Sequence, residues 1–205
     1  TSHVMILHYR MTGQVVLQRE DTRFVRLSWT SGNHQVAFVD PRRFGTVDVI
    51  PLEHLSAWLD GKNLGAEIWP EFHTGEWWKL RFARIQSNIK TALLRQDRVV
   101  GIGNILASEF CFAARIHPEQ RTNTLSDAQW VQLADAAQHR VTAILEEERA
   151  DKIGFLHEGA KNPDAFQVYG REGEACPRCS SNILKMVQSG RSTFFCATCQ
   201  VLSDI

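Results

Sequence analysis

Four cysteines near the end of the chain have the type and spacing of a metal site. They form two Cys-x-x-Cys pairs, Cys176 with Cys179 and Cys196 with Cys199, separated by sixteen residues. Two disulfides or a redox-active pair are the alternatives, but the repeated pair and the strand-like run between the two pairs favour zinc. Four thiolates complete a tetrahedron and leave no position open for a substrate. We therefore expect one structural Zn²⁺.

Residues 40–45, Asp-Pro-Arg-Arg-Phe-Gly, place a rigid proline, two arginines and an aromatic ring at one strand turn. In a purely structural interpretation, Phe44 belongs to the core and the arginines pair with acids. In the other interpretation, Phe44 wedges between stacked bases while Arg42 contacts the base left without a partner. Enzymes that extrude a nucleotide hold the duplex open in this way.

Two further signals point to phosphate, and each is weak by itself. Gly101 and Gly103 do not form a dinucleotide-binding loop, because no third glycine completes the Gly-x-Gly-x-x-Gly pattern before Ala107 and no βαβ unit surrounds them. A helix that begins beside Asn104 does offer backbone and amide N–H groups to a phosphate. Arg191 leads into the second cysteine pair, where zinc would hold it in place as a contact to a nucleic-acid backbone.

Composition bounds the class of protein. The 205 residues carry no formal net charge, but residues 79–121 contain eight basic and three acidic side chains. Charge alone does not separate a phosphate-binding face from a solvated helix face. Cys111 stands in an apolar stretch and is expected to be buried, and the cysteine usage fits a reducing cytoplasm. The sequence has no run of eighteen apolar residues and no signal peptide, so neither membrane insertion nor secretion is expected.

The elements that must position these residues follow from periodicity and punctuation. Short β-branched and aromatic runs predict an antiparallel meander of five strands, at 4–10, 15–19, 24–29, 36–39 and 46–50. Helices are predicted at 52–59, from the cap Thr74 onward, at 88–95, at 104–114 and, behind a capping box at 126–129, at 127–147. The fold class is therefore α+β. We divide it into a β part (1–51), a helical part (52–150), a linker (151–167) and a zinc hairpin (168–205).

Together these segments resemble one family, the formamidopyrimidine-DNA glycosylases and endonucleases VIII of base-excision repair. The matching segments run in the family's order over nearly the whole chain. They are His8–Gly13, Asp40–Gly45, Val100–Glu109, Ala114–Pro118, Gln167–Gly170 and the zinc hairpin. The resemblance implies a partial β-sandwich, a helix-two-turns-helix domain within 52–150, a lesion loop within 151–167 and a zinc finger.

The resemblance also implies roles for single residues. Met11, Arg42 and Phe44 would fill the void left by a flipped nucleotide, with Arg42 facing the orphaned base. Asn104 would be the phosphate ligand of the helix-two-turns-helix motif and Arg191 that of the zinc finger, with Tyr169 adding a contact. The implied partner is double-stranded DNA, damaged or abasic, bound by a monomer in the cytoplasm and, in a bacterium, associated with the nucleoid.

One departure concerns catalysis. The family's nucleophile is the amine of an N-terminal proline followed by glutamate, whereas this sequence begins Thr1-Ser2-His3 and its first proline is Pro41. None of its residues is therefore assigned as catalytic. Three explanations stay open: a fragment of a full glycosylase and AP lyase, a shortened non-catalytic relative that binds damaged DNA or junctions, and one half of a split enzyme. The lesion loop, 156–166, is also short, so a preference for oxidised purines or pyrimidines is not assigned.

Overall fold

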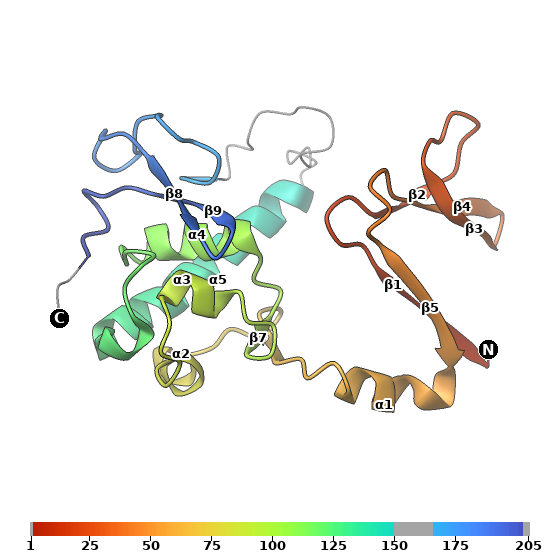
Figure 1. The fold of residues 1–205 in the computed structure, drawn as a ribbon, viewed down its shortest axis with the longest axis horizontal. Coiled ribbons are helices and arrows are strands. Elements are labelled where there is room, and N and C mark those ends of the chain that lie inside the picture. Colours follow the sequence, from red (N-terminus) through yellow and green to blue (C-terminus); the bar gives the residue numbers. More distant parts are fainter. Residues whose placement is uncertain (1, 150–165, 203–205) are drawn as a thin grey trace. The chain divides into compact units, whose positions relative to one another are not determined.

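The computed structural model describes residues 2–149 and 166–202, so the predicted linker at 151–167 lies almost entirely outside the described residues. The chain divides into two compact units, Thr1–Lys62 and Asn63–Ile205, and each is described by itself (Figure 1). Among the described helices, none combines the length and the apolar character needed to cross a lipid bilayer.

The first unit contains the five predicted strands, but the predicted meander is wrong. Strand β1 (His3–His8) pairs with β5 (Thr46–Pro51), the last strand of the unit. The other three form a second antiparallel sheet with β4 (His34–Val39) between β2 (Gln14–Leu17) and β3 (Val25–Ser31). Apolar alternation assigns a strand's two faces and does not say which strand lies beside it. The helix predicted next is present as a 3₁₀ turn, Leu52–His54, and α1, Leu55–Asp60.

The described residues of the second unit contain four α-helices: α2 (Gly75–Phe82), α3 (Ile89–Leu93), α4 (Asn104–Ala113) and α5 (Asp127–Arg149). A short 3₁₀ helix (Thr122–Thr124) precedes α5, and β6 (Ala66–Glu67) pairs in parallel with β7 (Val99–Val100). The caps that the sequence predicts are confirmed. The Thr74 hydroxyl accepts the N–H of Trp77, and Ser126 and Gln129 exchange hydrogen bonds of 2.9 and 3.3 Å.

The helical core forms where α5 crosses α2 and α4. Trp78, Phe82, Phe110, Trp130 and Leu133 are all buried there. At the crossing with α2 the helix backbones approach closely, since a Cβ added to Gly75 would lie 2.7 Å from Cα of Val131. Helix α4 begins at Asn104. Because it packs tightly against α5, its position within the unit is fixed.

The zinc hairpin consists of β8 (Leu184–Gln188) and β9 (Arg191–Phe195), an antiparallel pair joined by Ser189 and Gly190. Both turn residues have positive φ, 49° and 73°, as two-residue hairpin turns require. The hairpin lies beside α4 in Figure 1 and shares a small apolar core with Phe112 of that helix. Because the contact is apolar and buried, the hairpin and α4 form one packed assembly.

Candidate metal centre and nucleic-acid interface

The four cysteines of the predicted zinc site converge near the open end of the hairpin, where β8 begins and β9 ends. All four Sγ atoms lie within 4.8 Å of one another, with Cys176 to Cys199 at 3.9 Å and Cys179 to Cys196 at 3.4 Å. Zinc–sulfur bonds of about 2.3 Å in a tetrahedron place the sulfurs roughly 3.8 Å apart. The donor set and its spacing therefore fit one structural zinc ion. The fifth cysteine, Cys111, is buried in α4, as expected.

The turns that carry the two cysteine pairs are hydrogen-bonded to the end of α4 and to the segment after it. The Arg178 guanidinium donates to the carbonyls of Phe112, at 2.6 Å, and Ala113, at 3.0 Å. These carbonyls belong to the last turn of α4, where the C=O groups find no N–H partner within the helix. After the second cysteine pair, Gln200 accepts the Cys196 N–H at 2.9 Å and donates to the Ile116 carbonyl at 2.8 Å. Zinc thus fixes the hairpin relative to α4.

The N-terminal end of α4 meets strand β9 at Asn104. The Asn104 side-chain amide donates to the Ser192 carbonyl at 2.8 Å and, in a longer contact of 3.4 Å, to the Tyr169 hydroxyl. Ser192 directly follows Arg191, whose side chain is exposed. The three residues predicted to bind phosphate, Asn104, Tyr169 and Arg191, are therefore neighbours in space.

A residue that sequence reasoning missed, Lys90, lies behind this group. Its side chain is fully buried, and its ammonium donates to the Asn104 side-chain carbonyl at 2.5 Å. Burial lowers the pKa of Lys90 to about 8; the nearby Cys111 acts against this shift, and the positive charge of Arg191 adds to it. Because ammonium only donates, it fixes which end of the Asn104 amide points inward and leaves the N–H groups outward. The signal in the sequence was a lysine inside an apolar helix.

Glu109 is the second residue that was missed. It is fully buried, and its carboxylate accepts the backbone N–H groups of Gln167, Val168 and Tyr169 at 2.9–3.1 Å. The Arg140 guanidinium lies 3.2 Å away as the ionic partner. Glu109 thereby holds the segment that carries Tyr169 against α4. A glutamate between Ser108 and Phe110 in an otherwise apolar helix was the available signal.

In the first unit, the predicted loop at 40–45 is organised by Asp40, which is buried. Its carboxylate accepts the Thr12 hydroxyl at 2.5 Å and the backbone N–H groups of Arg42, at 3.2 Å, and Gly45, at 2.7 Å. The Thr12 and Gly45 bonds are the main reason that the pKa of Asp40 lies below its usual value. The bond from Thr12 ties the turn that carries Met11 to the loop that carries Arg42.

Two glycines bring the same turn and loop together. A Cβ at Gly13 would lie 2.8 Å from the Phe38 ring, and one at Gly45 would lie 2.5 Å from it. Phe38 is buried between them, whereas Phe44 is 53% exposed. The interpretation of Phe44 as a core residue is therefore wrong. The ring stacks instead under the Arg42 guanidinium, 4.8 Å from its centroid, and Met11 is 73% exposed.

The basic stretch at 79–121 does not form one free cationic face. Lys90 is buried, Lys79 pairs with Asp127, and Arg95 and Arg98 share Asp97. Arg81 stacks on Trp77 at 3.5 Å from the ring centroid. Five of the eight basic side chains thus already have structural partners, so the count of charges overstated what is available to bind phosphate.

The sequence matches three family descriptions in succession. Residues 1–47 match "Formamidopyrimidine-DNA glycosylase N-terminal domain", residues 64–153 match "Formamidopyrimidine-DNA glycosylase H2TH domain", and residues 173–201 match "Zinc finger found in FPG and IleRS". The third match contains all four cysteines of the metal site. The second contains Lys90, Asn104 and Glu109.

Named relatives and solved structures agree. The chain is 33% identical to the formamidopyrimidine-DNA glycosylase of Pelotomaculum thermopropionicum and 35% identical to that of Gluconobacter oxydans. These matches span 97% and 96% of this chain, and 74% and 75% of the relatives. The Lactococcus lactis Fpg in complex with an abasic site containing DNA superposes with a TM-score of 0.84 at 29% identity, over 98% of this chain and 76% of that chain. MutM in complex with carbocyclic 8-oxo-G containing DNA gives a TM-score of 0.82 at 29% identity, over 98% and 75%. The chain belongs to the formamidopyrimidine-DNA glycosylase family.

Proposed function

We propose that this protein acts in base-excision repair as a DNA glycosylase of its family, and that its described residues hold damaged double-stranded DNA. The observation that carries the proposal is the junction at Asn104. There the start of α4, the segment with Tyr169 and the zinc-bound strand with Arg191 meet within hydrogen-bonding distance. An N–H-rich helix end beside an exposed guanidinium is the chemistry that recognises a phosphate.

Phosphate binding at this junction would use groups that are already oriented. The first backbone N–H groups of α4 have no partners within the helix. The Asn104 contact with Tyr169, at 3.4 Å, is the longer of its two donor contacts and is the one that a phosphate oxygen can replace. Arg191 supplies the charge. We propose that these three residues grip the DNA backbone and that Lys90 and Glu109 position them.

Met11, Arg42 and Phe44 have the second proposed role, filling the void after a nucleotide leaves the duplex. Proteins that kink or open a duplex insert apolar side chains between base steps, and the exposed Met11 and Phe44 side chains suit that role. Asp40 holds the backbone of this loop, so the Arg42–Phe44 stack is presented with little freedom to lose on binding. Arg42 would then contact the orphaned base.

The related proteins named above are bacterial, and a protein that binds duplex DNA without strict sequence preference spends most of its time on the chromosome. We propose accordingly that the protein is associated with the nucleoid. The proposed division of labour is void filling by the β part, phosphate binding by the helical part, and zinc-dependent positioning of Arg191 by the hairpin.

The test is a salt titration of affinity for matched and abasic-site duplexes. Arg191→Ala should weaken both duplexes and reduce the slope of log K against log salt by about one unit, because one cationic contact is lost. Asn104→Ala should weaken both with the slope nearly kept, because the amide carries no charge. Lys185→Ala is the matched control, since it removes an exposed cation from the same hairpin. An equal slope change for Lys185→Ala and Arg191→Ala would reject the assigned phosphate contact.

Phe44→Ala tests the void-filling role separately. Loss of the ring should reduce the preference for abasic over matched DNA and leave matched-duplex affinity nearly unchanged, because the wedge acts only where a base step is opened. Thermal stability should also be kept, since the ring is half-exposed. If Phe44→Ala weakens both duplexes equally, the proposed wedge does not exist.

A further inference from the structure

Lys90 on α3 is a buried cation to which the described residues offer no counter-ion. Its side chain is fully buried, and its ammonium donates to the side-chain oxygen of Asn104, a neutral group, at 2.5 Å. None of the described carboxylates forms an ion pair with it. Buried charges in proteins are normally paired, because removing a charge from water is costly. The surroundings of Lys90 therefore suit an anion that comes from a bound partner.

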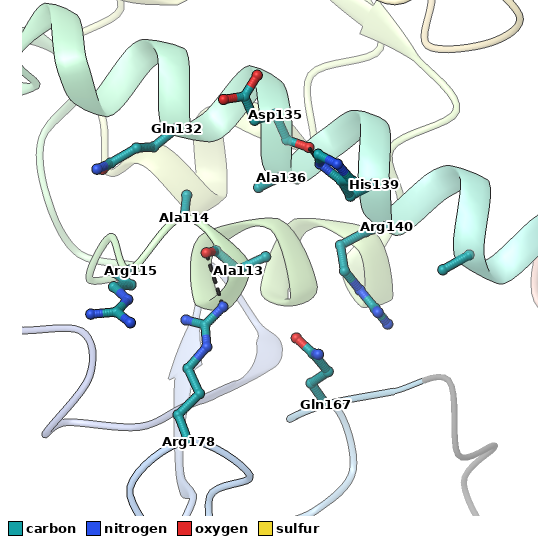
Figure 2. A pocket seen from close by; sticks show the side chains of 11 residues that line it. Ala113, Ala114, Arg115, Gln132, Asp135, Ala136, His139, Arg140, Gln167 and Arg178 are labelled. Carbon is teal, nitrogen blue, oxygen red and sulfur yellow. Dashed lines mark hydrogen bonds between the residues drawn. The ribbon is translucent and has the colours of Figure 1, made fainter.

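The elements packed around this ammonium hold no free acid. Helix α3 and strand β9 contain no carboxylate, and the one carboxylate of α4 is Glu109, which is paired with Arg140. In Figure 2 the Arg140 side chain reaches from α5 towards Gln167, whose backbone N–H also binds Glu109. The segment at 117–121 packs against α3 through backbone hydrogen bonds, and its Glu119 is exposed. The missing negative charge is thus not supplied by any of these elements.

The neighbouring ionisable groups leave Lys90 free to titrate alone near pH 8. Burial lowers the pKa of Lys90 to about 8; Cys111 of α4 opposes this shift, and Arg191 of β9 adds to it. Burial raises the pKa of the Cys111 thiol to about 12 and lowers the pKa of His117, so neither changes its charge between pH 8 and pH 10. Lys90 itself changes from charged to neutral at the start of this range.

The proposed phosphate site lies one amide group away from Lys90. The Asn104 oxygen accepts the ammonium, and on the other side the Asn104 NH₂ donates to the Ser192 carbonyl and the Tyr169 hydroxyl. A phosphate oxygen bound by this NH₂ would lie within about 8 Å of the ammonium, since one amide and two hydrogen bonds separate them. At an effective dielectric constant of about 20, opposite charges at that distance favour the charged lysine by on the order of tenfold.

We propose that Lys90 is the counter-ion of the phosphate held at Asn104, and that binding of the DNA backbone there takes up a proton from solution. The proton adds to the Lys90 amine nitrogen in those molecules that have lost it, and the buffer supplies it. Lys90 acts through Asn104 and is a positioning residue. The inference rests on the proposed phosphate contact and adds its regulation by pH. Because linkage is reciprocal, affinity for duplex DNA should be constant below about pH 8 and fall as the pH rises above it.

The experiment is isothermal titration calorimetry with an abasic-site duplex at pH 8.5, in two buffers of equal ionic strength and different ionisation enthalpy. The change in observed heat between the buffers counts the protons that are taken up. We expect about half a proton per duplex at pH 8.5, because Lys90 is then mostly neutral in the free protein and mostly charged in the complex. The uptake should be close to zero at pH 7, where both states are charged, and at pH 10, where both are neutral.

Lys90→Met removes the charge and keeps an unbranched side chain. The variant should lose the proton uptake and bind the duplex about tenfold more weakly at pH 7.5, in line with the electrostatic preference above. At pH 9.5 its affinity should approach that of the unchanged protein, which has lost the same charge. Lys185→Met is the matched control, because it makes the same exchange at an exposed lysine of the zinc hairpin. The control should keep the uptake and its dependence on pH.

Absence of uptake by the unchanged protein at pH 8.5 would overturn the proposal, and so would equal uptake by Lys90→Met. Weakening by the same factor at every pH would also overturn it, since a purely structural role gives that result. If Lys90→Met does not fold, the pH profile of uptake by the unchanged protein decides. A maximum near pH 8.5 supports the proposal, and a maximum near pH 6.5 or pH 10 assigns the proton to a histidine or an ordinary lysine. Arg191→Ala and Asn104→Ala test the phosphate contact itself at pH 7, where Lys90 stays charged, so the two failures are distinguishable.

Discussion

Replacing Glu109 with glutamine should destabilise the second unit strongly, although the two side chains have nearly the same shape. The carboxylate accepts three backbone N–H groups and faces Arg140 at 3.2 Å. Glutamine offers one acceptor oxygen and one NH₂ group, and the NH₂ cannot accept. If the amide oxygen takes the place of Oε1, which accepts all three N–H groups, the NH₂ group stands against the Gln167 N–H and the Arg140 guanidinium. If it takes the place of Oε2, the N–H groups of Val168 and Tyr169 lose their acceptor. In both cases Arg140 faces a neutral group in place of the carboxylate.

The magnitude follows from burial. Hydrogen bonds to a charged group contribute about 1.5–3 kcal/mol, and removing one partner of a buried ion pair costs about 3–5 kcal/mol. Because Glu109 is fully buried, solvent screens little of this loss. We expect Glu109→Gln to lower the free energy of unfolding by about 3–5 kcal/mol.

The assay is urea denaturation followed by tryptophan fluorescence, since Trp77, Trp78 and Trp130 all lie in the second unit. With a slope of roughly 2–3 kcal/mol per molar urea, the midpoint should fall by about 1–2 M. Glu119→Gln, at an exposed position, is the matched control and should leave the midpoint unchanged.

A double variant separates loss of hydrogen bonds from the stranded charge. Glu109→Gln combined with Arg140→Gln should recover part of the loss, because the second change removes the guanidinium that no longer faces the Glu109 carboxylate. Affinity for duplex DNA should fall in Glu109→Gln as Tyr169 loses its support. A midpoint shift below that expected for about 1 kcal/mol would refute the reasoning. It would mean that neither the hydrogen bonds of the carboxylate nor its ion pair with Arg140 contributes to stability.

Three further outcomes are expected. Metal analysis should find one zinc per chain, and Cys176→Ser should disorder the hairpin and weaken DNA binding, because the zinc-binding free energy is also local folding free energy; near-zero zinc in reduced protein would contradict this. Between about pH 8 and the usual lysine pKa of 10.5, the unfolded chain binds a proton at Lys90 that the folded chain has released, so the free energy of unfolding should rise with pH. Lys90→Met should abolish this rise, which urea midpoints at pH 7.5 and pH 10 measure. An unchanged rise would show that Lys90 is not its source. Asp40→Asn should speed hydrogen exchange of the Gly45 amide and reduce the preference for abasic DNA. Because the pKa of Asp40 in the folded protein lies below its ordinary value of 3.8, the unchanged protein should keep this loop intact until the pH falls below 3.8. Loss of the loop above that pH would contradict the assignment.

Much of the architecture could be predicted from short stretches of sequence. The zinc ligands are two local pairs, the caps at Thr74 and Ser126 act over three residues, and the hairpin lies between the cysteine pairs. In each case the determining contacts are close in sequence, so spacing alone carries the information. The resemblance to a family also depended on such local segments, and the family matches confirmed it.

Tertiary structure alone decided the features that join distant segments. The bonds from Glu109 reach residues 58–60 positions away, and β1 pairs with β5 although three strands lie between them in sequence. The sequence pattern around Phe38 and Phe44 does not distinguish a buried ring from an exposed one. The packing of Gly13 and Gly45 against Phe38 does. Local periodicity determines which residues form an element and which face is apolar, but the partner of a buried charge or a strand edge depends on long-range packing, which no short window of the chain contains.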